Sequence, residues 1–372
     1  MRIGIDARFY SSAFTGIGCY VKELIQNLAE LDTRNEYVLF LRDPFFESFE
    51  VPNARFKKVR ADIRHYTFEE QWRFFLMLKA EKLDLMHFTH FNAPILYRGP
   101  SVVTIHDLTL NFFPGKKMGS AFNQFIYKRI INSITHRAKK IISVSEHTKK
   151  DLIKILHADP NKIRVIHNGV SQRFHRITNA QLLGKFCAQY GLTKPYILYT
   201  GVWRSHKNLV NLIKAFSILK HKFNFPGWLV ISGKEDPWYP EVQKTVHDEK
   251  LSGDVRFTGY VPDDDLVLLY NNAKTYVLPS FYEGFGLPAL EAFACGIPVC
   301  ATKTSAVPEV CGKDNATFFD PHSPLDMAEK IASLLADEKK QKQLIERGLT
   351  RVKDFSWQKM ARETLDIYNS SN

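Results

Sequence analysis

The sequence is poor in cysteine, with five cysteines in 372 residues and no CxxC pair among them. An odd number of cysteines cannot all be bridged, and structural zinc sites draw on closely spaced cysteine pairs. Both observations argue against a disulfide framework and against a zinc module. We expect reduced, buried thiols at the five positions, which are Cys19, Cys187, Cys295, Cys300 and Cys311.

The sequence also lacks a long apolar run. No window approaches the roughly 18 uninterrupted apolar residues of a membrane-spanning helix. Met1 leads directly into the strand-like run 2–6 rather than into a signal peptide. With 45% apolar and 24% charged residues, the composition is that of a globular protein. We therefore expect a cytoplasmic protein, free or peripheral at the inner face of the membrane.

Positive charge is in excess, at +12 overall, and it is unevenly distributed. The window 121–176 holds twelve basic residues against three acidic ones, a net charge of +9. Just before it, Phe112, Phe113, Lys116 and Lys117 place paired aromatic side chains beside paired basic ones. This combination suits an anionic membrane surface, which we expect as a partner of the basic N-terminal domain. An ordinary solvated basic face explains the same charges equally well.

Strand and helix signals alternate along the chain, which predicts an α/β fold of two doubly wound domains. A length of 372 residues suits two such domains, and we place them at 1–172 and 173–355. Strands are predicted at 37–41, 102–105 and 141–144 in the first domain, and at 196–200, 228–232, 255–257, 275–278 and 298–300 in the second.

A capping box is predicted at Thr67 and Glu70 in the first domain. It precedes Phe68, Trp72 and Phe75, which share one face of a helix.

The first chemical signal is the run from Thr15 to Gly18, which precedes a helical pattern from Tyr20 onward. Glycines such as Gly16 and Gly18 at a helix start let backbone N–H groups approach a phosphate. A dinucleotide-binding fingerprint would need a third glycine at Val21. This argues against an NAD-dependent enzyme, and a merely structural turn stays open.

The second signal is the run 199–208, directly after the first strand of the second domain. Binding sites of open α/β sheets form at the carboxyl ends of strands. Arg204 and Lys207 in this run could neutralise a diphosphate without a metal ion. A solvated basic turn is the alternative.

The third and strongest signal is the run 279–292. A glycine-rich bend at Gly284 and Gly286 carries Glu283, and a helix start with Pro288 leaves Glu291 about one turn in. The glycines let N–H groups approach a leaving phosphate, while the two carboxylates can bind sugar and ribose hydroxyls. Two capping glutamates are the alternative for either residue alone, but they leave the glycines and the proline unexplained.

The two glutamates, Glu283 and Glu291, have seven residues between them and resemble the hallmark of the family-four retaining glycosyltransferases of the GT-B fold. The resemblance covers nearly the whole chain through motifs in family order: Asp6-Ala7-Arg8, Thr15-Gly16-Ile17-Gly18, Thr104-Ile105-His106-Asp107-Leu108, Val144-Ser145-Glu146-His147-Thr148, Val165-Ile166-His167-Asn168-Gly169-Val170 and Phe257-Thr258-Gly259-Tyr260-Val261. It implies two Rossmann-like domains facing across a cleft, with the segment 356–372 returning to the first domain. It also implies retention of anomeric configuration and independence from a metal ion.

The resemblance implies a role for each matching residue. Arg204 and Lys207 would bind the donor diphosphate, Glu291 the ribose, and Glu283 the transferred sugar. His106 would contact the transferred sugar, and we group it with Glu283, Arg204 and Lys207 as catalytic. The complete donor set is Gly16, Gly18, Arg204, Lys207, Val261, Glu283, Gly284, Phe285, Gly286, Leu287 and Glu291. A satisfied structural histidine is the alternative reading of His106.

Acceptor-side residues are proposed at His87, His90 and Asp107. The two histidines follow a predicted strand and have no evident third or fourth ligand, which argues against a metal site. The acidic run 263–265 has the spacing of a metal-binding motif but opens a helix, where acids suit the dipole. We expect no metal and no cofactor beyond the nucleotide-sugar substrate.

The opening Asp-Ala-Arg and the loop around Arg204 look like those of bacterial surface-polysaccharide mannosyltransferases. GDP-mannose is therefore the expected donor, and a glycan or lipid-linked glycan the expected acceptor. Ser205 departs from the more common proline of this loop. A UDP-sugar donor and a nucleotide-sugar epimerase stay open as alternatives. A nucleic-acid binder would explain the basic window but no recognition motif supports it, so we expect no nucleic-acid partner.

Overall fold

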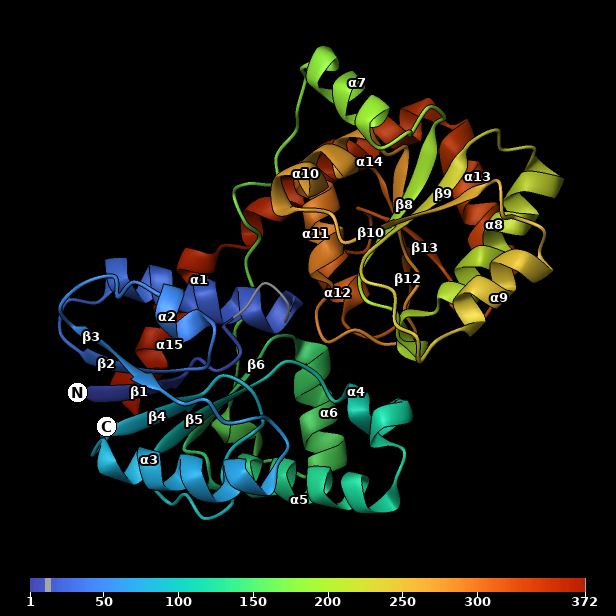
Figure 1. Cartoon of the computed structure of the whole chain (residues 1–372). Helices are drawn as coiled ribbons and strands as arrows, with labels where there is room; N and C mark the ends of the chain where they lie inside the picture. The colour runs from blue at the N-terminus through green and yellow to red at the C-terminus, as the bar shows by residue number, and fades with distance from the viewer. Residues whose placement is uncertain (11–14, 372) are drawn as a thin grey trace. The chain divides into compact units, whose positions relative to one another are not determined.

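The computed structural model describes residues 1–10 and 15–371, and they form two compact units (Figure 1). Unit 1 comprises Met1–Leu108, Lys117–Gly169 and Ser356–Asn372, and unit 2 comprises Thr109–Lys116 and Val170–Phe355. The chain thus passes to unit 2 near residue 170 and returns at Ser356. No sequence pattern predicted that the segment Thr109–Lys116 would group with unit 2.

Unit 1 is built on a parallel sheet of seven strands in the order β3-β2-β1-β4-β5-β6-β7. Apolar side chains of β1, β2, β4 and β5 are buried on both faces of the sheet, as parallel strands require. The strands are β1 (Arg2–Asp6), β2 (Glu36–Leu41), β3 (Phe56–Arg60), β4 (Leu85–Phe88), β5 (Ser101–Ile105), β6 (Lys140–Ser143) and β7 (Ile163–Val165).

Helices cover both faces of this sheet, with α1 and α15 on one side and α3 and α5 on the other (Figure 1). The C-terminal helix α15 packs along α1. The helical elements are α1 (Thr15–Leu31), α2 (Phe45–Ser48), the π-helical η2 (Glu70–Phe74), α3 (Phe75–Ala80), η3 (Lys116–Met118), α5 (Ala121–Arg137), α6 (Glu146–Leu156), η4 (Pro160–Lys162) and α15 (Trp357–Ser370).

Gly169 lies where the chain leaves unit 1. A Cβ atom at this position would collide with the backbone of Ser356 and Trp357. A glycine is therefore needed where the outgoing and returning segments meet.

Two expectations for unit 1 need correction. Helix α1 already begins at Thr15, so Gly16 and Gly18 lie inside its first turns rather than in a preceding loop. One bond of the capping box is present, since the Glu70 amide donates to the Thr67 hydroxyl at 3.2 Å; the Glu70 carboxylate accepts from the amide of Tyr66, at 2.8 Å, rather than from that of Thr67. Phe68, however, lies on an outward face and is exposed.

Unit 2 repeats the design with six parallel strands in the order β10-β9-β8-β11-β12-β13. The predicted strands of this half are present, and the last strand, β13, was missed because it is three residues long. The strands are β8 (Tyr196–Thr200), β9 (Trp228–Ser232), β10 (Val255–Gly259), β11 (Thr275–Leu278), β12 (Val299–Thr302) and β13 (Thr317–Phe319).

Figure 1 shows α8, α9 and α13 on one side of this sheet and α10, α11 and α12 on the other. The first group buries one apolar cluster against β8 and β9. The helical elements are α4 (Thr109–Phe112), α7 (Ala180–Gln189), η5 (Ser205–Lys207), α8 (Leu209–Phe223), α9 (Glu241–Asp248), α10 (Asp263–Asn272), α11 (Leu287–Ala294), α12 (Val307–Cys311), α13 (Pro324–Ala336), α14 (Glu338–Arg351) and η6 (Val352–Asp354).

Candidate functional site

The carboxyl ends of β8 and β11 carry the residues that the sequence singled out in unit 2. These two strands are neighbours in the sheet, so the loops that follow them start side by side. The loop after β8 also lies close to the loop after β9. Gly233 has a φ of +136°, and a Cβ there would collide with the carbonyl group of Gly201. The close backbone approach therefore needs a glycine at position 233.

Two buried side chains hold the loop after β8 in place. Trp203 is buried and packs on Phe257, with ring centroids 5.2 Å apart. Asn208 has a left-handed φ of +61°, and its side-chain amide donates to the carbonyl oxygens of Pro279 at 2.9 Å and Pro321 at 2.8 Å. The sequence predicted no role for Asn208, although it stands directly after Lys207.

Lys207 and Glu283 form an ion pair across these loops. The lysine Nζ lies 2.8 Å and 2.9 Å from the two carboxylate oxygens of Glu283. Ser280 donates to one of these oxygens at 2.6 Å, and the Glu283 amide donates to Ser305 at 3.0 Å. Burial opposes ionisation of Glu283, but Lys207, His206 and Ser280 together lower its pKa below the usual range. The pair is thus a charged one, held by several fixed hydrogen bonds.

Arg204 makes a different ion pair. Its guanidinium group binds the carboxylate of Asp236, in the loop after β9, and lies 5.6 Å from the centre of the Tyr239 ring. The side chain keeps 37% of its surface exposed, compared with 20% for Lys207. Both cations of the predicted pair therefore lie at the carboxyl edge of the sheet, each beside a carboxylate.

The glycine-proline run forms the start of α11, as the sequence predicted. Gly286 is the N-cap residue with a φ of +105°, which only glycine adopts readily, and Pro288 lies in the first turn. Gly284 and Phe285 are buried, whereas Leu287 at the helix start is half-buried. The first backbone N–H groups of a helix have no partner within it. The start of α11 is therefore a place where an anion is favoured.

Glu291 lies one turn into α11, on the side of the sheet that carries α10. Its carboxylate accepts from the Tyr270 hydroxyl at 2.8 Å, and this hydroxyl also contacts the Thr200 hydroxyl at 2.7 Å. Burial raises the pKa of Glu291 to about 7, while the hydrogen bond from Tyr270 acts in the opposite direction. Hydrogen-bond donors placed around such a carboxyl group would favour its ionised form.

The segment before α10 contains Val261, which the resemblance placed in the donor-binding set. Val261 is buried, so its side chain is part of the unit 2 interior and its backbone is the portion left to contact a ligand. The acidic run opens α10 as predicted, although Pro262 is the N-cap residue. Asp263 pairs with Arg173, and Asp265 accepts from the Tyr190 hydroxyl at 2.6 Å.

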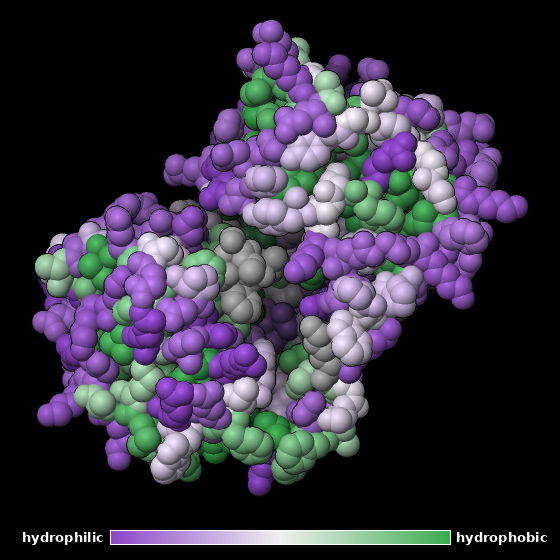
Figure 2. Space-filling model, in the orientation of Figure 1, coloured by the Kyte–Doolittle hydropathy of each residue, from purple (hydrophilic) through white to green (hydrophobic). Residues whose placement is uncertain are grey.

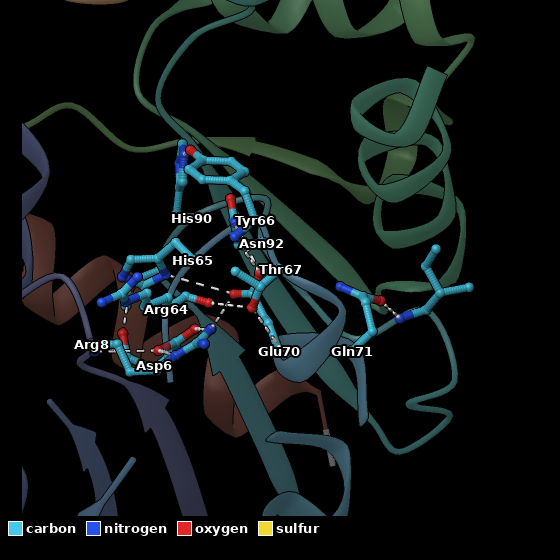
Figure 3. A network of polar contacts seen from close by, with 12 residues as sticks. Asp6, Arg8, Arg64, His65, Tyr66, Thr67, Glu70, Gln71, His90 and Asn92 are labelled. Atoms are coloured by element: carbon cyan, nitrogen blue, oxygen red, sulfur yellow. Dashed lines mark hydrogen bonds and ion pairs between the residues drawn. The ribbon is translucent and has the colours of Figure 1, made fainter. Parts of the chain in front are cut away.

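The Asp-Ala-Arg motif of unit 1 forms a buried ion-pair network at the end of β1 (Figure 3). The Arg8 guanidinium binds Asp6 through two hydrogen bonds of 2.8 Å and 2.7 Å, and Glu70 at 2.9 Å. It also stacks 3.8 Å from the centre of the Phe74 ring. The Nδ1 atom of His65 lies 3.6 Å from a carboxylate oxygen of Glu70. The motif therefore ties β1 to η2, and it gives Arg8 a structural role.

His87 is a structural residue, which corrects its assignment to the acceptor side. Its side chain is fully buried. One ring nitrogen lies 2.6 Å from the Tyr368 hydroxyl of α15, and the other 2.8 Å from the Thr104 hydroxyl, which in turn contacts Tyr20 of α1 at 2.9 Å. The residue points into the domain because it belongs to β4 rather than to the loop after it.

His90, His106 and Asp107 lie together at the carboxyl ends of β4 and β5. The His90 and His106 rings are 6.0 Å apart, and the His106 Nε2 donates to the Thr89 carbonyl oxygen at 2.9 Å. Burial lowers the pKa of His106, with Asp107 and the Thr89 hydrogen bond acting against it. His90 is partly exposed and contacts the Tyr66 hydroxyl at 3.3 Å. These residues form the candidate site of unit 1.

Both halves of the chain match families of known proteins. The model of glycosyl transferases group 1 matches residues 188–351, and the Glycosyltransferase Family 4 model matches residues 14–173. The chain also aligns with the Anabaena protein HepE, solved in complex with UDP and glucose, at a TM-score of 0.78 and 17% identity over 100% of both chains. This chain belongs to the GT-B glycosyltransferases.

Relatives of this glycosyltransferase include two proteins of Escherichia coli. It is 29% identical to the O-antigen chain mannosyltransferase B over 95% of this chain and 96% of that protein. It is 28% identical to the serotype-specific mannosyltransferase WbdA over 72% of this chain, which spans 33% of WbdA.

Among residues 1–10 and 15–371, no group of three or more His, Cys, Asp and Glu side chains is arranged to hold a metal ion. In the same part of the chain, no helix is both long and apolar enough to cross a bilayer.

Proposed function

We propose that this glycosyltransferase transfers mannose from GDP-mannose to a hydroxyl group of a glycan or lipid-linked glycan, with retention of configuration, in cell-surface polysaccharide biosynthesis. The relatives named as mannosyltransferases support the sugar and the pathway. We further propose that the reaction takes place on the cytoplasmic side, at the inner face of the membrane, and needs no metal ion.

The observation that carries the proposal is the arrangement of Lys207, Glu283 and the start of α11 in unit 2. A donor diphosphate would take Lys207 and Arg204 from their carboxylate partners and lie near the N–H groups that follow Gly286. Glu283 would then accept hydrogen bonds from hydroxyl groups of the sugar. Glu291, one turn into α11, would accept hydrogen bonds from hydroxyl groups of the ribose.

The same contacts support a mechanism. The bond from the anomeric carbon to the diphosphate oxygen breaks, and Arg204, Lys207 and the helix start stabilise the departing charge. The acceptor hydroxyl attacks the same face of the sugar and passes its proton to a phosphate oxygen. In a double displacement Glu283 would be the nucleophile. We propose the same-face route, in which Glu283 binds hydroxyl groups of the sugar and forms no covalent bond to it. For unit 1, we propose that His90, His106 and Asp107 bind the sugar substrates.

The test is protection of the protein against thermal unfolding by a panel of nucleotides. GDP and GDP-mannose should raise Tm, since a ligand at one hundred times its Kd stabilises by about 2.7 kcal/mol. The protection should survive a chelator and disappear in Lys207→Ala. UDP and UDP-glucose form the second arm, because HepE was solved with UDP and glucose. Protection by the UDP ligands alone would overturn the mannosyl assignment.

Transfer to an acceptor distinguishes a transferase from an epimerase. Released GDP should appear only when a glycan acceptor is present, and the product should show the anomeric configuration of the donor by NMR. Turnover of the nucleotide sugar without an acceptor would favour the epimerase.

A further inference from the structure

Unit 1 exposes a row of large apolar side chains on the helical segment 68–80. Phe68 is 78% exposed, Trp72 59% and Leu76 46%. They are four residues apart, so they lie on one face of the helical segment. Contiguous exposed apolar surface of this kind is uncommon on a globular protein and marks an interaction surface.

Helix α5 adds a second apolar row. Phe122 is 61% exposed and Phe125 is 58% exposed. The guanidinium group of Arg129, one turn further on, lies 5.6 Å from the centre of the Phe125 ring, and Lys128 is exposed beside it. The 17 residues of α5 include no acidic side chain. The outer face of α5 is therefore aromatic at its start and basic after that.

The two rows lie on neighbouring elements of unit 1, which are connected through the buried rings of Phe91 and Tyr127. Tyr66 lies 5.9 Å from Phe91, and Phe91 lies 5.1 Å from Tyr127 of α5, as ring centroids. Figure 1 shows α3 and α5 along the lower edge of unit 1, and Figure 2 shows hydrophobic residues among hydrophilic ones along the same edge. We call this the aromatic–basic surface, comprising Phe68, Trp72, Leu76, Phe122, Phe125 and Arg129.

The charges around the two apolar rows indicate which partner the aromatic–basic surface binds. Lys79 and Lys128 are exposed on the two elements. Glu69 is the exposed acid of the segment 68–80, and Arg73 pairs with it. We infer that the aromatic–basic surface docks on an anionic phospholipid bilayer, with the rings at the level of the headgroups and the cations beside the lipid phosphates. The inference rests on the proposed function in one respect, that a lipid-linked acceptor lies in such a bilayer.

This surface differs from the one expected from the sequence, whose residues Phe112, Phe113 and Lys116 lie in unit 2. Phe112 packs on Tyr282 and Phe113 on Phe281 within unit 2, with ring centroids 5.0 Å and 6.1 Å apart. Lys116 lies 3.9 Å from a carboxylate oxygen of Glu241, and the side chain of Lys117 lies outside the described residues. The segment Thr109–Lys116 thus contacts unit 2, while Phe112 and Lys116 are still exposed.

Sedimentation with vesicles tests the inference on the full-length protein. The wild type should bind vesicles of equal parts phosphatidylcholine and phosphatidylglycerol, release them as salt is raised, and ignore pure phosphatidylcholine. Phe122→Ser/Phe125→Ser should weaken binding about tenfold or more for each ring removed. Lys128→Glu/Arg129→Glu should weaken it about 25-fold or more, since each cation near such a surface contributes about fivefold.

Matched controls lie in unit 2. Phe223→Ser removes an exposed ring from α8, and Lys339→Glu/Lys342→Glu reverses two exposed charges on α14. Both should bind vesicles as the wild type does. Absent binding by the wild type, or equal binding by all variants, would overturn the inference. A dimer in solution that Phe122→Ser/Phe125→Ser converts to a monomer, without vesicle binding, would assign the surface to a second copy of the chain and would also overturn it.

Activity separates this inference from the proposed function. The surface variants should transfer sugar to a soluble acceptor at the wild-type rate and lose transfer to an acceptor embedded in anionic vesicles. If the wild type transfers no sugar at all, the proposed function fails while the vesicle result stands.

Discussion

The ion pair between Lys207 and Glu283 gives the sharpest test of the unit 2 site, through Lys207→Met. This change removes the cation and leaves Glu283 ionised among fixed groups. Loss of one partner of a fully buried pair costs about 3–5 kcal/mol. The two side chains keep 20% and 11% of their surface exposed, and Ser280 still donates to the carboxylate. We therefore expect a loss of about 2 kcal/mol for the unliganded protein.

The measurement is urea unfolding followed by circular dichroism, in a cycle with Glu283→Gln. The double variant should be more stable than the sum of the single changes predicts, by about 1–2 kcal/mol. The sign with pH follows from the lowered pKa of Glu283. The stabilisation by the pair is present above the unfolded pKa of about 4.3 and is lost as pH falls through the folded pKa. Additive single effects, or a Lys207→Met cost that persists in acid, would refute the reasoning.

The remaining predictions concern Glu291 and Asn208. Burial raises the pKa of Glu291 to about 7, so the folded state binds more protons than the unfolded state between about pH 4.3 and 7. Glu291→Gln should therefore gain stability relative to the wild type as pH rises through this window, by up to about 4 kcal/mol; parallel curves of Tm against pH would contradict this. Asn208→Gly keeps the left-handed conformation but removes the bonds to Pro279 and Pro321, and should cost about 2–3 kcal/mol in urea unfolding. Asn208→Ala should cost about 1 kcal/mol more, because alanine is strained there. Equal stability of Asn208→Gly and the wild type would show that the amide does not hold the loop.

Much of unit 2 was readable from the sequence because its signals are local. Buried parallel strands appear as short apolar runs, and the start of α11 follows from a glycine followed by a proline two residues on. The predicted positions of Glu283 and Glu291 beside this start needed only the spacing along one segment. The short strand β13 was missed because three residues carry too little pattern.

The errors have one physical cause, the direction in which a side chain points. His87 and His90 are three residues apart, yet one lies in the interior and the other at the strand end. The spacing of Phe68 places it on an apolar helical face, yet its side chain is exposed. A spacing in the sequence defines a face of an element but does not tell which neighbour covers it.

The sequence by itself determined the family, the alternation of strands and helices, and the residue types that can bind a sugar diphosphate. Only the tertiary structure decided which of those residues meet. Lys207 and Glu283 are 76 positions apart in the chain, and they form a pair because β8 and β11 are neighbours in the sheet. Strand order depends on how the whole unit buries its apolar surface, and this is a property that no single segment contains.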